Sequence, residues 1–382
     1  MKSLRLLALS CCAALALCAP ASASEPAEVW RGTVDTLPVA LSLSQGGGDE
    51  VYGQYFYFKH LRDLELQGKR DDKGLHLQVL DRKGAATERW ELSAKGDALE
   101  GQWRAGKRSL PVRLQRVDIA ALRAGREGER YRRAGDDASG FDALRVSELA
   151  LEKSRIQQFQ GHQLQWWREP RTGMELFTVE SGVDQPARGR VNDILKQRLW
   201  RSAIDALQCT SAPDSDFDLT VTPRLLDRRF LSLSLMASYY CGGAHPDFGD
   251  SPLTIDVRSG RELALEDVLW LGKGAPPRAG KGDYDSAGYK QLSEYRQSTL
   301  APWTVKTLAA LHPAQMAPPK GDDEDGCDYS DTGVWGTSIW YLTAEGLYLG
   351  PYFARVARAC EYPEWSLVPW KQVEAHPGPA LK

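Results

Sequence analysis

After Ser24 the sequence contains no apolar run long enough to cross a bilayer, which argues against a membrane-spanning helix in that part of the chain. It also lacks a basic excess, because 48 lysines and arginines face 51 aspartates and glutamates and leave a formal net charge of −3. That balance excludes the basic footprint of a nucleic-acid-binding protein. The motifs GxSxG and HExxH and a phosphate-cradling glycine loop are missing as well. The sequence therefore carries none of these signatures of serine hydrolases, zinc proteases or nucleotide-binding proteins.

The first residues, in contrast, have the pattern of a signal peptide. Lys2 and Arg5 give a basic start, Leu6–Leu17 is apolar, and Ala21-Ser22-Ala23 is a small-residue cleavage pattern. We predict that residues 1–23 are removed and that the protein is exported to the periplasm or out of the cell. A retained N-terminal anchor and a lipoprotein are alternatives. The formal charge then changes from −3 to −5, because two basic residues and no acidic residue are lost.

Cysteine is scarce, and the four cysteines after the signal peptide form no CxxC pair: Cys209, Cys241, Cys327 and Cys360. An even number of cysteines in an exported protein predicts two disulfides, with three possible pairings. We favour Cys209–Cys241 and Cys327–Cys360, because each pair falls within one proposed structural unit. A zinc site is the alternative, and the wide spacing disfavours it. We expect no metal and no cofactor.

Residues 24–117 are predicted to form a β domain of short strands separated by glycine-containing turns. The expected strands are Val29–Val34, Val39–Leu43, Val51–Phe58, Asp63–Gln67, Leu75–Leu80, Thr87–Leu92, Ala98–Trp103 and Leu110–Leu114. Their regular spacing favours an antiparallel meander that closes into a small barrel or sandwich. Tyr55, Tyr57, Trp90 and Trp103 either line a ligand cavity or fill the core, and the core is the more common outcome.

Two further segments complete the chain. Residues 118–141 mix arginines, acidic residues and glycines, and we predict a charged linker there. Residues 142–382 are predicted to form an α+β domain. Its clearest helix has apolar residues in 3- and 4-residue steps from Val191 to Leu207. The acidic run 322–326 fails as an EF-hand, since its glycine at the sixth position would put Gly321 at the first ligand position.

The most strongly patterned stretch is Phe230–Asp250. Alternation from Leu231 to Tyr240 predicts a strand with one buried face, which then enters the peptide Cys-Gly-Gly-Ala-His-Pro. The two glycines permit backbone angles that side chains forbid, and the proline removes a ladder donor. The candidate binding residues at this turn are Tyr239, Tyr240, Gly242, Gly243, His245 and Asp247. No catalytic group is assigned. The alternative is that His245 acts as a general base with a neighbouring carboxylate.

Three pieces in order carry a family resemblance: the Tyr239–Pro246 peptide, the segment Asp256–Leu263, and the closing stretch Tyr341–Leu347 followed by Tyr352. The chain from residue 142 to 373 thereby resembles the exported domain shared by the lysozyme-sensing anti-sigma factor RsiV and a peptidoglycan-deacetylase accessory region. The resemblance implies an extracytoplasmic α+β domain with no established catalytic role, which in RsiV binds lysozyme. This chain departs from RsiV in its cleavable signal, its lack of a membrane helix and its added β module.

These observations together predict an exported binding protein of the bacterial cell envelope. Its expected ligands are a lysozyme or peptidoglycan fragments, and nucleic acid is excluded as a partner. The alternative function is an envelope hydrolase that uses His245 with Asp247 or another nearby acid.

Overall fold

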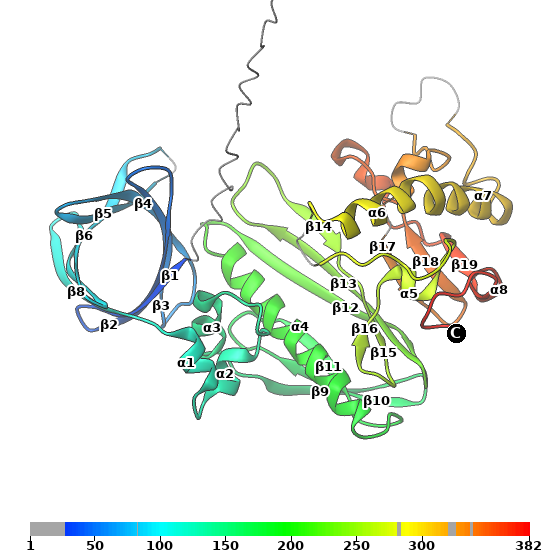
Figure 1. Cartoon of the computed structure of the whole chain (residues 1–382), viewed down its shortest axis with the longest axis horizontal. Coiled ribbons are helices and arrows are strands. Elements are labelled where there is room, and N and C mark those ends of the chain that lie inside the picture. The colour runs from blue at the N-terminus through cyan, green and yellow to red at the C-terminus, as the bar shows by residue number, and fades with distance from the viewer. Residues whose placement is uncertain (1–26, 82, 281–283, 320–325, 337–338) are drawn as a thin grey trace, which may run out of the picture. The chain divides into compact units, whose positions relative to one another are not determined.

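The computed structural model describes residues 27–382 except 82, 281–283, 320–325 and 337–338 (Figure 1). The predicted signal peptide lies outside the described residues. Contacts divide the chain into two compact units. The first comprises the described residues up to Asp35, Leu41–Gln54 and Glu65–Arg116, and the second Thr36–Ala40, Tyr55–Leu64 and the described residues from Val117 to Lys382. No helix in the described ranges is long and apolar enough to span a membrane.

The N-terminal strands form a closed antiparallel barrel, as Figure 1 shows. Its strands are β1 Glu28–Val34, β2 Leu37–Gln45, β3 Glu50–Tyr57, β4 Leu64–Asp71, β5 Gly74–Leu80, β6 Ala86–Lys95, β7 Ala98–Ala105 and β8 Arg108–Arg116. Each overlaps one predicted strand. Closure comes from pairing of β1 with β8, from Trp30 opposite Arg116 to Val34 opposite Val112. The predicted meander is thus confirmed, and it closes as a barrel because the two edge strands pair with each other.

The barrel interior is a packed core. Trp90 is fully buried and lies opposite Leu77 on one neighbouring strand and Trp103 on the other. Trp103 is 6% exposed, and its indole N–H donates to Glu88 Oε2 at 2.7 Å. Tyr55 is also fully buried. These aromatic side chains therefore fill the barrel core. The polar group of a buried tryptophan or tyrosine usually finds a hydrogen-bond partner, as that of Trp103 does.

The segment predicted as a charged linker contains two short helices, α1 Ile119–Ala124 and α2 Gly128–Arg132, followed by α3 Gly140–Val146. Its arginines cap backbone carbonyls: Arg123 donates to Ala138 O at 2.7 Å, and Arg130 donates to Ser147 O at 2.7 Å. Guanidinium groups have five donors in a fixed fork, so they can hold such a glycine-rich segment together. Composition alone did not predict these contacts.

The second unit contains three antiparallel sheets. The first consists of β9 Glu152–Phe159, β10 His162–Arg168 and β11 Glu175–Val179. The second consists of β12 Asp216–Leu226, β13 Phe230–Tyr240, β14 Asp247–Asp250, β15 Leu253–Asp256 and β16 Arg261–Glu262, and the third of β17 Ile339–Leu342, β18 Gly346–Gly350 and β19 Leu367–Pro369. Helix α4, Ala187–Cys209, contacts β11 and β12. The predicted α+β class and the predicted long helix are confirmed.

Strand β13 is the centre of the second sheet, with β12 on one side and β14 and β15 on the other. The prediction of one buried face is wrong for its first half, since Ser232 and Ser234 are as buried as the leucines between them. Ser232 Oγ lies 2.7 Å from Thr254 Oγ1 and accepts from the amide of Leu342 at 2.9 Å. Buried hydroxyls are tolerated where they are hydrogen-bonded, and here they join the second sheet to the third.

The remaining helices surround the third sheet. They are α5 Leu265–Val268, α6 Ala287–Tyr295, the π-helical turn η1 Arg296–Leu300, α7 Ala301–Leu311, the 3-10 turns η2 Thr332–Trp335 and η3 Arg355–Cys360, and α8 Trp370–Glu374. The π-turn immediately precedes Pro302 in α7, because a proline has no amide for the preceding turn and the helix shifts its bonding there.

Candidate functional site

The Cys-Gly-Gly-Ala-His-Pro peptide is the loop of a β-hairpin. Strands β13 and β14 pair from Tyr239 opposite Asp247 to Met236 opposite Asp250, and residues 241–246 connect them. His245 and Pro246 are exposed and lie at the end of this loop, directly before β14. Tyr239 stacks on Phe217 of β12, with ring centroids 5.9 Å apart, and Tyr240 is half-buried opposite Asp216. The two tyrosines therefore support the hairpin from its stem.

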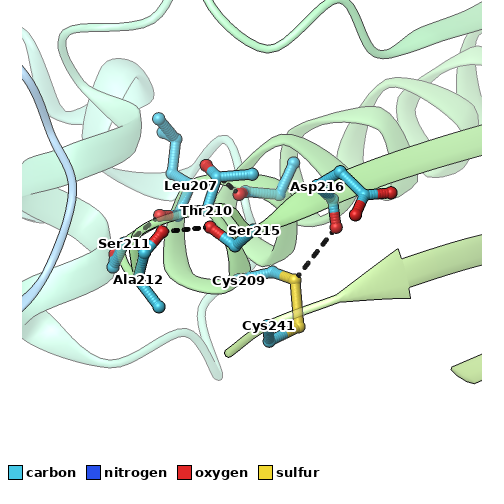
Figure 2. The surroundings of a disulfide bond; sticks show 9 residues. Leu207, Cys209, Thr210, Ser211, Ala212, Ser215, Asp216 and Cys241 are labelled. Carbon is cyan, nitrogen blue, oxygen red and sulfur yellow. Dashed lines mark hydrogen bonds between the residues drawn. A yellow bond between two sulfur atoms is a disulfide. The ribbon is translucent and has the colours of Figure 1, made fainter. Parts of the chain in front are cut away.

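A disulfide fixes the start of this loop to the end of α4. Cys209 and Cys241 are bonded with their Cα atoms 4.5 Å apart, and Figure 2 shows the bond beside the turn that carries Thr210, Ser211 and Ser215. Ser211 Oγ donates to Leu207 O at 2.9 Å, which closes the last turn of the helix. Cys327 and Cys360 form the second bond. The structure thus contains the pairing predicted from the sequence.

The two loop glycines differ in their conformation. Gly242 has φ +84°, and a Cβ atom there would lie 2.6 Å from Ala212 Cβ. Gly243 has no positive φ, and nothing lies within 4 Å of the position its Cβ would take. Only Gly242 therefore needs to be glycine, which corrects the expectation for Gly243.

We predict that Gly242→Ala destabilises the protein by roughly 1–3 kcal/mol, because alanine must adopt a left-handed backbone and displace Ala212. Gly243→Ala is the matched control and should leave stability nearly unchanged. Denaturant unfolding of the two variants measures the difference. Equal losses in both variants would contradict this assignment.

Asp247 is held by arginines from η3. Arg355 lies 3.4 Å from one of its oxygens, and Arg358 forms an ion pair with the other. The amide N–H of Phe248 donates to Asp247 Oδ1 at 2.9 Å, and this bond together with the charges of the two arginines lowers the pKa of the carboxyl group. Arg355 also donates to Pro246 O at 2.9 Å. The end of the loop is thus tied to η3, as its start is tied to α4.

His245 has no such partner. Among the residues that the structure describes, none makes a hydrogen bond or ion pair with its ring, and Asp247 is already bound by two arginines. Asp250, the other acid, accepts from Ser234 Oγ at 2.6 Å and from the amide of Leu235 at 2.7 Å. Burial raises the pKa of the Asp250 carboxyl. The candidate residues are thus brought to one hairpin, but without a histidine–carboxylate pair.

Sequence reasoning missed several exposed residues of η3 and β14, which we group with the exposed loop residues. Val356 is fully exposed and Phe248 is 37% exposed, and the Arg358 guanidinium lies 4.6 Å from the centroid of the Phe248 ring. We call the exposed set His245, Pro246, Phe248, Arg355 and Val356 the hairpin-loop surface. The only signal was Arg355 and Arg358 three residues apart, which does not indicate which strand they contact.

No group of three or more histidine, cysteine or acidic side chains suited to a metal ion occurs in the described part of the chain. Residues 320–325, which hold most of the acidic run considered above, lie outside that part.

Comparisons with known proteins give only weak similarity to solved structures. No family model matches the sequence, and no curated protein matches it. The chain is similar to a crystal structure of a member of the DUF3298 family from Bacteroides fragilis, with 13% sequence identity. The similarity covers 60% of this chain and 94% of that chain, with a TM-score of 0.33.

Proposed function

We propose that this protein is an exported binding protein of the cell envelope and that the hairpin-loop surface contacts its partner. The observation that carries the proposal is the anchoring of an exposed loop at both ends. The Cys209–Cys241 bond fixes one end, and Asp247 with Arg355 and Arg358 fixes the other. A loop held in one conformation loses little entropy on binding.

The chemistry of the surface favours a protein partner. Exposed Phe248 and Val356 offer apolar area that contact with another protein would cover. Arg355 and Arg358 face Asp247 and Glu361, so the four charges cancel. The net charge of the whole chain is negative, which favours a basic partner at long range. A c-type lysozyme, the partner implied by the family resemblance, is a basic protein and the first candidate.

The test is a calorimetric titration of residues 24–382, with both disulfides formed, against a c-type lysozyme. Val356→Asp should weaken binding at least about tenfold, because it places a charge in the apolar part of the contact. Ile156→Asp is the control, since Ile156 is 61% exposed on β9 of a different sheet. Equal affinities for the two variants would remove the hairpin-loop surface from the proposal.

The same preparation tests the hydrolase alternative. Turnover of a cell-wall substrate that His245→Ala abolishes at an unchanged melting temperature would replace the binding proposal with a catalytic one. The binding proposal predicts that His245→Ala changes affinity and no turnover.

A further inference from the structure

The outer face of the barrel carries a groove that runs across four strands. The pairing of β4, β5 and β6 sets Gln67, Gln78 and Arg89 in one cross-strand row and Lys69, His76 and Glu91 in another. Between them runs the row Gly68, Leu77 and Trp90, whose two side chains point into the core. Side chains two residues apart share a face, so the two outer rows are the walls and the middle backbone is the floor.

Strand β3 extends both walls. Tyr52 and Glu50 flank the buried Val51, and both line the same groove, which has a volume of about 450 Å³. Tyr52 is 50% exposed, and its hydroxyl donates to Glu50 Oε2 at 3.0 Å. Four strands about 4.8 Å apart give the groove a length of about 14 Å, enough for an extended chain rather than a single small molecule.

The groove carries no excess of charge. Lys69 and Arg89 balance Glu50 and Glu91. Lys69 lies 3.2 Å from Asp49, Glu91 lies 3.0 Å from Arg104, and His76 lies 3.3 Å from Asp71. These contacts already engage most of the charged wall. A polyanion needs an uncompensated basic track, and a lipid needs an apolar one, so neither class fits.

The amides on the other wall remain available. The side chains of Gln67, Gln78 and Arg89 form no hydrogen bond with other residues in the described ranges. A carboxamide both donates and accepts, which matches hydroxyl groups that also do both. A half-exposed tyrosine at one end adds a flat apolar face with a polar tip.

We infer that this groove binds a neutral, hydroxyl-rich oligosaccharide. Sugar hydroxyls meet the amides of Gln67 and Gln78 and the Arg89 guanidinium, and a sugar ring packs on Tyr52. The inference goes beyond the proposed function, because it assigns a second ligand class to side chains of the first unit alone. A titration with lysozyme that shows no binding leaves it intact.

The test is a calorimetric titration of residues 24–382 with three uncharged tetrasaccharides: chitotetraose in its N-acetylated form, cellotetraose and maltotetraose. We expect saturable binding of at least one of them. Gln78→Ala and Tyr52→Ala should each lower that affinity roughly fivefold, as expected for loss of a hydrogen bond or a ring contact. Gln115→Ala is the matched control, because Gln115 is an exposed β8 glutamine outside the groove.

Three results would overturn the inference. One is the absence of saturable binding for all three sugars at millimolar concentration. The other is an equal loss of affinity in Gln78→Ala and Gln115→Ala, which would place the sugar elsewhere. Tighter binding of heparin than of every neutral sugar would show that the ligand class is wrong.

Discussion

Removal of the Cys209–Cys241 bond, by alanine at both positions, is expected to lower the free energy of unfolding by about 3–4 kcal/mol. The bond closes a loop over a sequence separation of 32, and its absence returns that loop's conformational freedom to the unfolded chain. The change should also release residues 241–246 from α4, so the affinity for lysozyme should fall together with the stability. Denaturant unfolding and calorimetric titration of the same variant measure the two effects.

The second disulfide supplies the control for stability. Cys327 and Cys360 have a separation of 33, so a double alanine variant there should lose a similar free energy if loop entropy dominates. A loss of less than about 1 kcal/mol in the Cys209 and Cys241 variant would contradict the view that this bond restrains the hairpin.

Replacement of Asp267 by alanine is expected to cost about 3 kcal/mol. Its carboxylate is fully buried in α5 and accepts two hydrogen bonds from each of Arg261 and Arg278, at 2.5 to 3.3 Å. It also accepts from the amide of Ala264 at 2.9 Å. The expected cost is at the low end for a broken buried pair, because both arginines are half exposed and can turn to water.

The same residue predicts a pH dependence. Burial acts to raise the pKa of Asp267, but the hydrogen bonds from Arg278, Arg261 and Ala264 outweigh it and lower that pKa from 3.8 to about 2. A folded pKa below the unfolded one gives stability that is present above pH 3.8 and is lost as pH falls towards 2. The free energy of unfolding should fall by about 2 kcal/mol over that pH range.

Unfolding of the wild type and Asp267→Asn from pH 6 to pH 2 checks this dependence. The stability difference between them should be constant above about pH 5 and shrink below it. A difference that stays constant down to pH 2 would show that the ionised carboxylate is not what stabilises α5. Glu127→Ala, which breaks an exposed pair with Arg130, should change stability little at any pH.

Hydrophobic periodicity predicted the strands and the helix whose buried and exposed sides follow from neighbouring residues in the sequence. The eight barrel strands follow from alternation and turn residues, and α4 follows from its 3- and 4-residue steps. Alternation misled at β13, where Ser232 and Ser234 suggested a solvent-facing side. Both hydroxyls are buried because residues farther along the chain are their hydrogen-bond partners: Thr254 and Leu342 for Ser232, and Asp250 for Ser234.

The candidate site was predicted only in part for a related reason. The turn at Gly242 and the pairing of Cys209 with Cys241 follow from local residue types and cysteine count. The ion pairs of Asp247 join residues 108 and 111 positions apart, and no local pattern sets such a contact. The barrel groove escaped notice because its walls consist of ordinary exposed polar residues that only strand register aligns.

The titration of residues 24–382 against a c-type lysozyme tests the central claim most directly. The account predicts saturable heat with micromolar or tighter affinity, loss of lytic activity in the bound lysozyme, and a clear weakening by Val356→Asp but not by Ile156→Asp. A flat titration at low salt, with both disulfides intact, would contradict lysozyme as the partner of the hairpin-loop surface.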